Sequence, residues 1–242
     1  MEPPKGLIYT GAGDFILDGK KHLSYLINLA GLKPSHRVLD IGSGLGRSAI
    51  ALTGYLSSSG SYEGFDVVKS GVNWCSKKIT PDFNNFRFTY VDLKNDLYKS
   101  TGNDAAQFIF PYKDNEFDMV FLMSVFTHMS LDEIGHYLSE IHRVLKPTGK
   151  CLFTCFYYNE NTLKRMAERS TAMVFEINKG HYRLMDKKVK SANICIETGY
   201  LKNMIDRNRF STEKTIEGYW KNFNIQIGND YQDIFVIKKS GQ

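Results

Sequence analysis

The chain has 242 residues, of which 42% are apolar and 24% are charged, a composition typical of a soluble globular domain and unlike that of a disordered segment. The longest apolar run, "MVFLMSVF", is too short to cross a bilayer, and "MEPPKGLIYT" lacks the apolar core of a signal peptide. The expectation is therefore a cytoplasmic protein without a membrane partner. The cysteines lack the spacing of a zinc site or a disulfide scaffold, which predicts buried thiols and no metal: Cys75, Cys151, Cys155 and Cys195.

Most of the net charge of +5 lies in one segment. Between Asn159 and Ile194, eight Lys or Arg residues face four acids, which leaves +4 of the total there. Such a segment is compatible with an anionic small-molecule acceptor or with nucleic acid, and a solvated surface is the simpler interpretation. The basic residues are Lys164, Arg165, Arg169, Lys179, Arg183, Lys187, Lys188 and Lys190.

Helical and strand-like segments alternate through the first two thirds of the chain. A helix is expected over about residues 15–32, ended by Gly31 and Pro34. Strands are expected at 37–41, 62–67, 86–92, 117–123 and 150–158, and helices between them at 46–58, 71–79 and 131–145. This alternation predicts βαβ units, and hence a parallel sheet with helices on both faces.

The alternation stops after Tyr158. Residues of about 157–195 form a basic insertion, with a helix expected over 161–169 and a hairpin around "NKG". A helix at 198–207 and strands "KTIEGYW" and "QDIFVIKK" follow, and their short connection requires an antiparallel pair. The predicted fold is a single α/β domain over residues 1–242, with a doubly wound, mostly parallel, Rossmann-like sheet of seven strands that ends in an antiparallel hairpin.

The stretch "VLDIGSGLGR" places three glycines directly after the first strand. Gly42, Gly44 and Gly46 leave the backbone open to a ligand at the turn where doubly wound folds bind one. Their spacing is G-x-G-x-G, which differs from the G-x-G-x-x-G of dinucleotide sites. Asp40, at the end of the strand, suits a positively charged ligand better than a pyrophosphate.

This stretch resembles the first motif of the class I S-adenosylmethionine-dependent methyltransferases. The blocks "FPYKDNEFDMVFLMSVFTHM" and "YLSEIHRVLKPTGKCLFT" are similar to the fourth- and fifth-strand blocks of the methyltransferase-11 type, and "SVFTHM" to a bacterial subset of it. The resemblance implies S-adenosylmethionine as cofactor and S-adenosylhomocysteine as product, with Asp66 on the ribose hydroxyls and Asp92, or nearby Asn95 or Asp96, at the adenine amine. The implied cofactor-binding residues are Asp40, Gly42, Ser43, Gly44, Gly46, Asp66, Val67, Asp92, Leu93 and Ser124.

Missing signatures restrict the methyl acceptor. The fourth strand ends in "MSVF", without the Pro-Pro-aromatic pattern of enzymes that methylate base amines or the Pro-Cys pair of cytosine-modifying enzymes, which argues against nucleic acid. A hydroxyl or amine of a small molecule, such as a sugar or other metabolite, remains. Two alternatives stay open: a nicotinamide-dependent oxidoreductase, and a cofactor-binding homologue without activity.

His128 is the candidate general base. The block "SVFTHMS" resembles a loop of phosphoethanolamine methyltransferases, where a histidine assists the acceptor, although Phe15 stands near the position of their tyrosine partner. Imidazole has a pKa suited to accepting a hydroxyl proton near neutral pH, and the alternative role is to cap the helix that starts near Ser130.

The insertion is expected to cover the substrate side of the sheet, or alternatively to form a homodimer interface. Its residues expected near the acceptor are Tyr157, Tyr158, His181, Tyr182 and Arg183.

Overall fold

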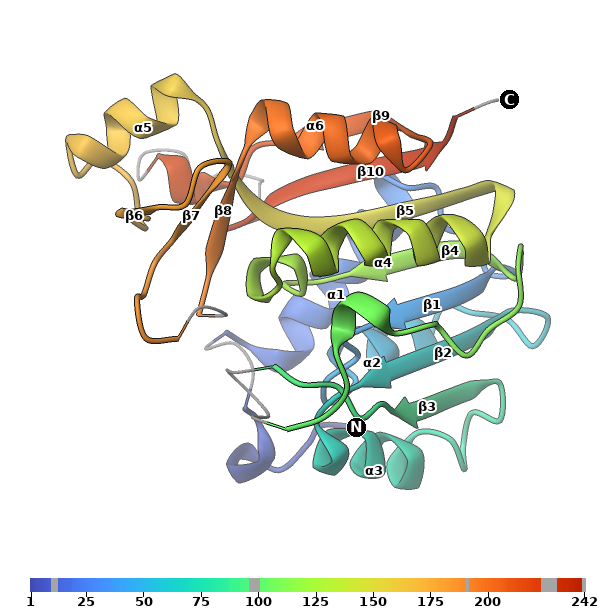
Figure 1. The fold of residues 1–242 in the computed structure, drawn as a ribbon. Helices are drawn as coiled ribbons and strands as arrows, with labels where there is room; N and C mark the ends of the chain where they lie inside the picture. Colours follow the sequence, from blue (N-terminus) through green and yellow to red (C-terminus); the bar gives the residue numbers. More distant parts are fainter. Residues whose placement is uncertain (10–12, 96–100, 190–191, 223–229, 241–242) are drawn as a thin grey trace.

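The computed structural model describes residues 1–9, 13–95, 101–189, 192–222 and 230–240. Its central sheet has the order β3-β2-β1-β4-β5-β10-β9, in which β10 runs antiparallel to both of its neighbours (Figure 1). The predicted seven-stranded, mostly parallel sheet with an antiparallel end is therefore confirmed. The strands are β1 (Arg37–Ile41), β2 (Ser61–Asp66), β3 (Phe86–Tyr90), β4 (Phe117–Leu122), β5 (Leu145–Tyr158), β9 (Phe210–Ile216) and β10 (Asp233–Lys239).

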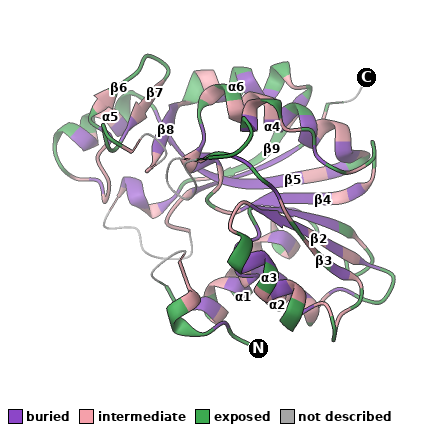
Figure 2. Cartoon of the chain, turned by 60° about the horizontal axis from the view of Figure 1, so that its bottom comes forward, coloured by how far each residue is buried: buried purple, intermediate pink, exposed green. Residues whose placement is uncertain are grey.

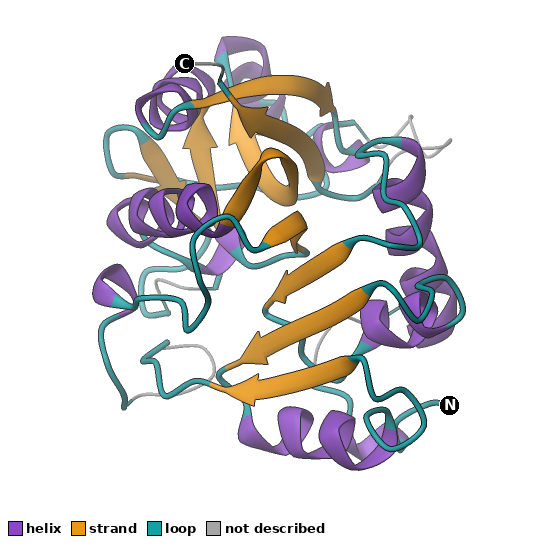
Figure 3. Cartoon of the chain, turned by 90° about the vertical axis from the view of Figure 1, so that its right-hand side faces the viewer, coloured by secondary structure: helices purple, strands orange, loops and turns teal. Residues whose placement is uncertain are grey.

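Helices cover both faces of this sheet, as Figure 3 shows. The side chains of β4 alternate between two cores: Val120 contributes to one and Phe121 to the other. The strands in the middle of the sheet are buried along most of their length (Figure 2). The first core includes α4 (Leu131–Val144) and α6 (Thr198–Arg207), and the second includes α1 (Phe15–Asn28), α2 (Arg47–Thr53) and α3 (Lys69–Lys78). No described helix is long and apolar enough to span a bilayer.

Helix α1 ends earlier than the periodicity predicts, at Asn28 instead of Leu32. Gly31 adopts a left-handed φ of 75°, its N–H donates to the Ile27 carbonyl at 3.1 Å, and the Leu32 N–H donates to the Leu26 carbonyl at 2.9 Å. These two bonds satisfy the last helical carbonyls and turn the chain toward β1.

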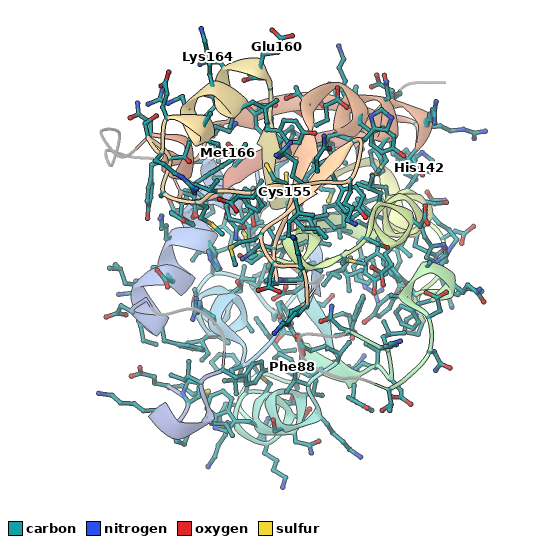
Figure 4. All side chains as sticks on the ribbon, turned by 60° about the vertical axis from the view of Figure 1, so that its left-hand side comes forward. Phe88, His142, Cys155, Glu160, Lys164 and Met166 are labelled. Carbon is teal, nitrogen blue, oxygen red and sulfur yellow. The ribbon has the colours of Figure 1, made fainter. Side chains whose placement is uncertain are left out.

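The insertion extends the sheet at the carboxyl end of β5. It contains α5 (Glu160–Ala167), β6 (Ile177–Asn178), β7 (Tyr182–Leu184) and β8 (Ile194–Glu197). The predicted helix and hairpin are confirmed, whereas β8, which pairs in parallel with the last residues of β5, was not predicted. In Figure 1 these elements lie on the side toward which the arrowheads of β1–β4 point. In Figure 4, Glu160 and Lys164 of α5 point outward and Met166 points inward.

The expectation of one strand over residues 214–220 is wrong. Strand β9 ends at Ile216, and Tyr219–Lys221 form a turn of 3₁₀ helix. The cause is Asp233: its Oδ1 accepts the Gly218 N–H at 2.8 Å and its Oδ2 accepts the Trp220 indole N–H at 2.8 Å, which draws the chain away from the sheet.

Asp233 is a fully buried carboxylate at the start of β10. Lys221 Nζ lies 2.9 Å from its Oδ1, and the Tyr157 N–H donates to its Oδ2 at 3.1 Å. Burial raises the pKa of Asp233, while Lys221 and the hydrogen bonds oppose that rise. The same ammonium lies 3.1 Å from the centroid of the Tyr157 ring. This cluster connects β10 to the point where the insertion leaves β5.

Replacing Lys221 with Met should strongly destabilise the fold. The variant leaves the Asp233 carboxylate buried without its cation, which costs about 3–5 kcal/mol when one partner of a buried pair is removed. The loss should be larger at pH 8 than at pH 5, because Asp233 can take up a proton in acid. Urea unfolding at both pH values measures it, and the Lys221→Met/Asp233→Asn double variant should recover most of the stability. A single variant as stable as the wild type would contradict this account.

Candidate active site

A cavity of about 510 Å³ opens where the loops after β1, β2 and β4 meet. It brings together nearly all of the predicted site residues: Asp40, Gly42, Ser43, Gly44, Asp66, Val67, Leu93, Ser124 and His128. They meet there because the carboxyl ends of neighbouring parallel strands share one edge of the sheet.

The glycine turn after β1 forms one wall of the cavity. Gly42 and Gly44 have φ values of 78° and 54°, in the left-handed region that favours glycine. A Cβ on Gly42 would lie 2.5 Å from Val125 Cγ2, so this position has no room for a side chain. The Ser43 hydroxyl is buried and has no hydrogen-bond partner among the described residues. An open backbone with an unpaired hydroxyl fits a ligand held closely against the turn.

Asp66, at the end of β2, fixes this turn to the neighbouring strand. Its Oδ2 accepts the Gly44 N–H and its Oδ1 accepts the Val68 N–H, both at 2.8 Å. Burial raises the pKa of Asp66, and these backbone bonds oppose the rise. Each carboxylate oxygen keeps a lone pair for a further donor, so the geometry fits the two hydroxyls of a ribose.

Asp40 is buried beneath the turn, where its Oδ2 accepts the Tyr62 hydroxyl at 2.6 Å. The pKa of Asp40 is raised to about 7: burial raises it most, the Tyr62 hydrogen bond opposes this rise, and the charge of Asp66 adds to it. A cation beside Asp40 would favour its ionised form. The position therefore fits the positively charged ligand that the sequence predicts.

Two predicted cofactor residues do not line the cavity. Gly46, with φ 75°, directly precedes α2 as its N-cap, and a Cβ there would lie 2.9 Å from Cys75 Sγ, so this glycine lets α2 pack against α3. Asp92 is exposed and accepts the Tyr90 hydroxyl at 3.3 Å. Asn95 lines the cavity instead, and its Nδ2 donates to the His128 carbonyl at 3.1 Å. Asp96 lies outside the described residues.

Ser124 has a left-handed φ of 61° at the point where the chain leaves β4. Its N–H donates to Thr154 Oγ1 at 2.8 Å and its hydroxyl donates to Gln232 Oε1 at 3.0 Å. Thr154 also donates to Gln232 Oε1, at 2.6 Å. These three bonds stabilise a backbone conformation that is uncommon outside glycine and typical of functional sites.

His128 ends the short 3₁₀ turn Phe126–His128 and lines the cavity. The helix cap considered as its alternative role belongs to Ser130, whose Oγ accepts the Glu133 N–H at 3.3 Å while Glu133 accepts the Ser130 N–H at 2.6 Å. The cap therefore does not explain the position of His128.

The insertion supplies Met173 and Asn193 to the cavity and none of the five residues expected near an acceptor: Tyr157, Tyr158, His181, Tyr182 and Arg183. Its described basic residues also lie outside the lining, and Lys190 falls outside the described residues. The charge of the segment is therefore on the surface and gives no support to an anionic acceptor.

Other contacts hold these side chains. Tyr157 and Tyr158 are buried in the cores. The His181 ring stacks on Tyr200 with centroids 4.5 Å apart, and Arg183 Nε donates to the Phe175 carbonyl at 2.6 Å.

Sequence reasoning missed several residues that line the cavity. His22 of α1 has its Nδ1 2.9 Å from Ser48 Oγ of α2, and burial lowers the pKa of His22 to about 4, so its imidazole is neutral at pH 7. Tyr231 and Gln232 reach the cavity from the segment before β10. Nothing in the local sequence marks these residues, because only the tertiary fold brings them to the site.

The cysteines take no part in the site. All four are buried thiols, as expected. In the described part of the chain, no group of three or more His, Cys, Asp or Glu side chains is arranged to hold a metal ion.

Residues 39–153 match a family model described as a methyltransferase domain. A sterol 24-C-methyltransferase of Neurospora crassa is 27% identical over 211 residues, which are 83% of this chain and 50% of that protein. A phosphoethanolamine N-methyltransferase of Plasmodium falciparum is 27% identical over 130 residues, which are 53% of this chain and 42% of that protein. The chain thus spans half or less of the length of these two relatives.

A solved structure with a similar fold is the 1,6-didemethyltoxoflavin-N1-methyltransferase of Burkholderia thailandensis with bound 1,6-didemethyltoxoflavin and S-adenosylhomocysteine. Its TM-score is 0.59 at 14% identity, with 95% of this chain and 80% of that chain covered. The family model favours the methyltransferase interpretation over the nicotinamide-dependent oxidoreductase.

Replacing Asp40 with Asn should change how the stability of the ligand-free protein depends on pH. The pKa of Asp40 is about 7 when folded and about 3.9 when unfolded, so its neutral form stabilises the fold below pH 4 and this contribution is lost as the pH rises to 7. The full loss by pH 8 is about 4 kcal/mol, of which about 2.5 kcal/mol falls between pH 5 and pH 8, and the variant should not show it. Urea unfolding at pH 5 and pH 8 measures the difference. Equal pH slopes in the two proteins would show that Asp40 does not titrate in this way.

Proposed function

Since residues 39–153 match the methyltransferase-domain family model, we propose that this chain is a class I S-adenosylmethionine-dependent methyltransferase and transfers a methyl group to a hydroxyl or amine of a small molecule. The observation that carries the proposal is one cavity that joins the glycine turn and Asp66 to His128. Two of the matched relatives are named as methyltransferases of a sterol and of phosphoethanolamine, which supports a small acceptor.

The chain's own residues would hold the cofactor at the glycine turn. Asp66 would accept the ribose hydroxyls, while Gly42 and Gly44 would let the ligand lie against the backbone. Val67 and Leu93 would pack beside the adenine, and Asp40 would lie toward the positive charge. When bound, S-adenosylmethionine supplies a methyl group on a sulfonium, which is open to displacement by a nucleophile.

His128 would act on the acceptor. Its neutral imidazole would take the proton of the acceptor hydroxyl as that oxygen becomes the nucleophile. Part of the rate would come from holding acceptor and methyl group in line.

The hydrogen bonds of Gln232 favour an acceptor that carries an oxygen atom. Its Oε1 already accepts hydrogen bonds from Ser124 and Thr154, which assigns the carbonyl end of the amide to those two hydroxyls. The Nε2 group then remains as a donor for a ligand, at a residue that lines the cavity. We propose that it binds a hydroxyl or carbonyl oxygen of the acceptor.

The insertion would act as a cap on the acceptor through Met173 and Asn193. Both residues line the cavity, and β8 holds Asn193 near the carboxyl end of β5. A homodimer interface on the outer, basic face of the insertion is compatible with this role, since the two functions use different surfaces.

Replacing His128 with Ala should lower turnover by roughly 10²- to 10⁴-fold, the range typical of a lost general base. The measurement transfers radiolabel from S-adenosylmethionine to an extract of small metabolites at pH 8, where an unperturbed imidazole is neutral. The affinity for S-adenosylhomocysteine, measured by calorimetry, should stay within a few-fold of the wild type, because His128 acts on the acceptor.

His142→Ala is the matched control, because this histidine lies on α4 outside the cavity and contacts Phe210. Near-normal turnover in His128→Ala would limit His128 to positioning. A wild-type protein that binds S-adenosylhomocysteine but labels nothing would support the non-catalytic alternative.

A further inference from the structure

His22 and Ser48 form a polar pair on the cavity wall that the proposed reaction does not use. His22 lies on α1 and Ser48 on the first turn of α2, with Nδ1 and Oγ 2.9 Å apart. Both residues line the same cavity as Asp40 and Gly42. Ser48 is buried, so the serine fixes the orientation of the imidazole ring.

The order of the strands gives the direction in which a bound cofactor must run. With its ribose at Asp66 on β2, its adenine extends toward Leu93 after β3. Its amino-acid end must then extend the other way, across β1 toward β4. Ser48 directly follows the glycine turn of β1, and α1 packs against α2, so the pair lies on that side of the site.

The amino-acid end of the cofactor carries one ammonium and one carboxylate. Asp40 can face only the ammonium favourably, so the carboxylate needs hydrogen-bond donors. With Nδ1 engaged by Ser48, the imidazole of His22 has Nε2 for a ligand. Arg47 also lines the cavity, but its Nη1 lies 3.2 Å from Asp18 Oδ2 and its guanidinium lies over the ring of Phe15.

We propose that His22, oriented by Ser48, binds the carboxylate of the amino-acid end of S-adenosylmethionine and thereby positions the cofactor along the glycine turn. The inference rests on the cofactor orientation of the proposed function and assigns to α1 a role in recognition. The sequence pattern of α1 predicts a helix and assigns it no residue of the site.

The test compares two ligands that differ in the carboxylate alone: S-adenosylmethionine and its decarboxylated form. Calorimetry gives the dissociation constant of each for the wild type and for His22→Leu. The wild type should prefer S-adenosylmethionine, and the variant should lose roughly ten- to a hundredfold of that preference, since a hydrogen bond to a charged group contributes about 1.5–3 kcal/mol. His22→Gln, which keeps a donor, should recover part of the preference.

His36→Leu serves as the control, because His36 lies outside the cavity and contacts the Lys33 backbone N–H. An unchanged preference in His22→Leu overturns the inference. Equal weakening of both ligands also overturns it, because that result indicates a structural role. Failure of the wild type to bind either ligand would contradict the cofactor assignment of the proposed function, and the inference would fall with it.

Discussion

The hydrogen bond between the Gly44 N–H and the Asp66 carboxylate is the contact on which the site depends. It joins the turn after β1 to the end of β2, and so fixes the left-handed backbone at Gly42 and Gly44 in one geometry. The parallel pairing of the two strands sets its length, because Asp40 lies opposite Gly64 and Ile41 opposite Phe65. Since β4 pairs with the other side of β1, Ser124 and His128 reach the same edge. One register therefore brings the glycine turn and Asp66 to the same cavity as Ser124 and His128.

Burial of the Asp40 carboxylate lowers the stability of the fold, and the same burial favours binding of a positively charged ligand. Asp40 is buried beneath the turn with a pKa of about 7. Its ionised form therefore destabilises the folded, ligand-free protein at physiological pH. A ligand cation beside it would relieve the strain and favour the ionised form. The residue that would select for a positively charged ligand is thus also one that destabilises the empty site. Ser124, with its left-handed φ and three polar contacts nearby, is a second place where local backbone preference gives way to the site.

Local patterns in the sequence were enough for the central sheet and for most of the residues that meet at the glycine turn. The glycine turn, Asp40 and Asp66 all lie within one βαβ unit, so their spacing in sequence reflects their spacing in the fold. The acceptor side could not be predicted in this way. Ser124 and Gln232 are 108 residues apart in sequence, and no periodicity brings them together. The residues of the insertion that line the cavity were not predicted for a related reason: charge and aromatic content do not say which way a side chain points. Arg183 and His181 point to contacts within the insertion and with α6.

The buried cluster at Asp233 connects two segments that reach the cavity: the segment that contains Gln232 and the insertion that follows β5. Asp233 receives the N–H of Tyr157 from β5 and the side chains of Trp220 and Lys221 from the connection before β10. Its neighbour Gln232 lines the cavity. Tyr157 lies near the end of β5, where the insertion begins. A displacement of Asp233 would therefore shift Gln232 and the start of the insertion together. The backbone around Gly44 defines the cofactor side, which tolerates few changes. The proposed acceptor side is built from side chains on separate segments. Substitutions there could alter which acceptor binds without disturbing the glycine turn.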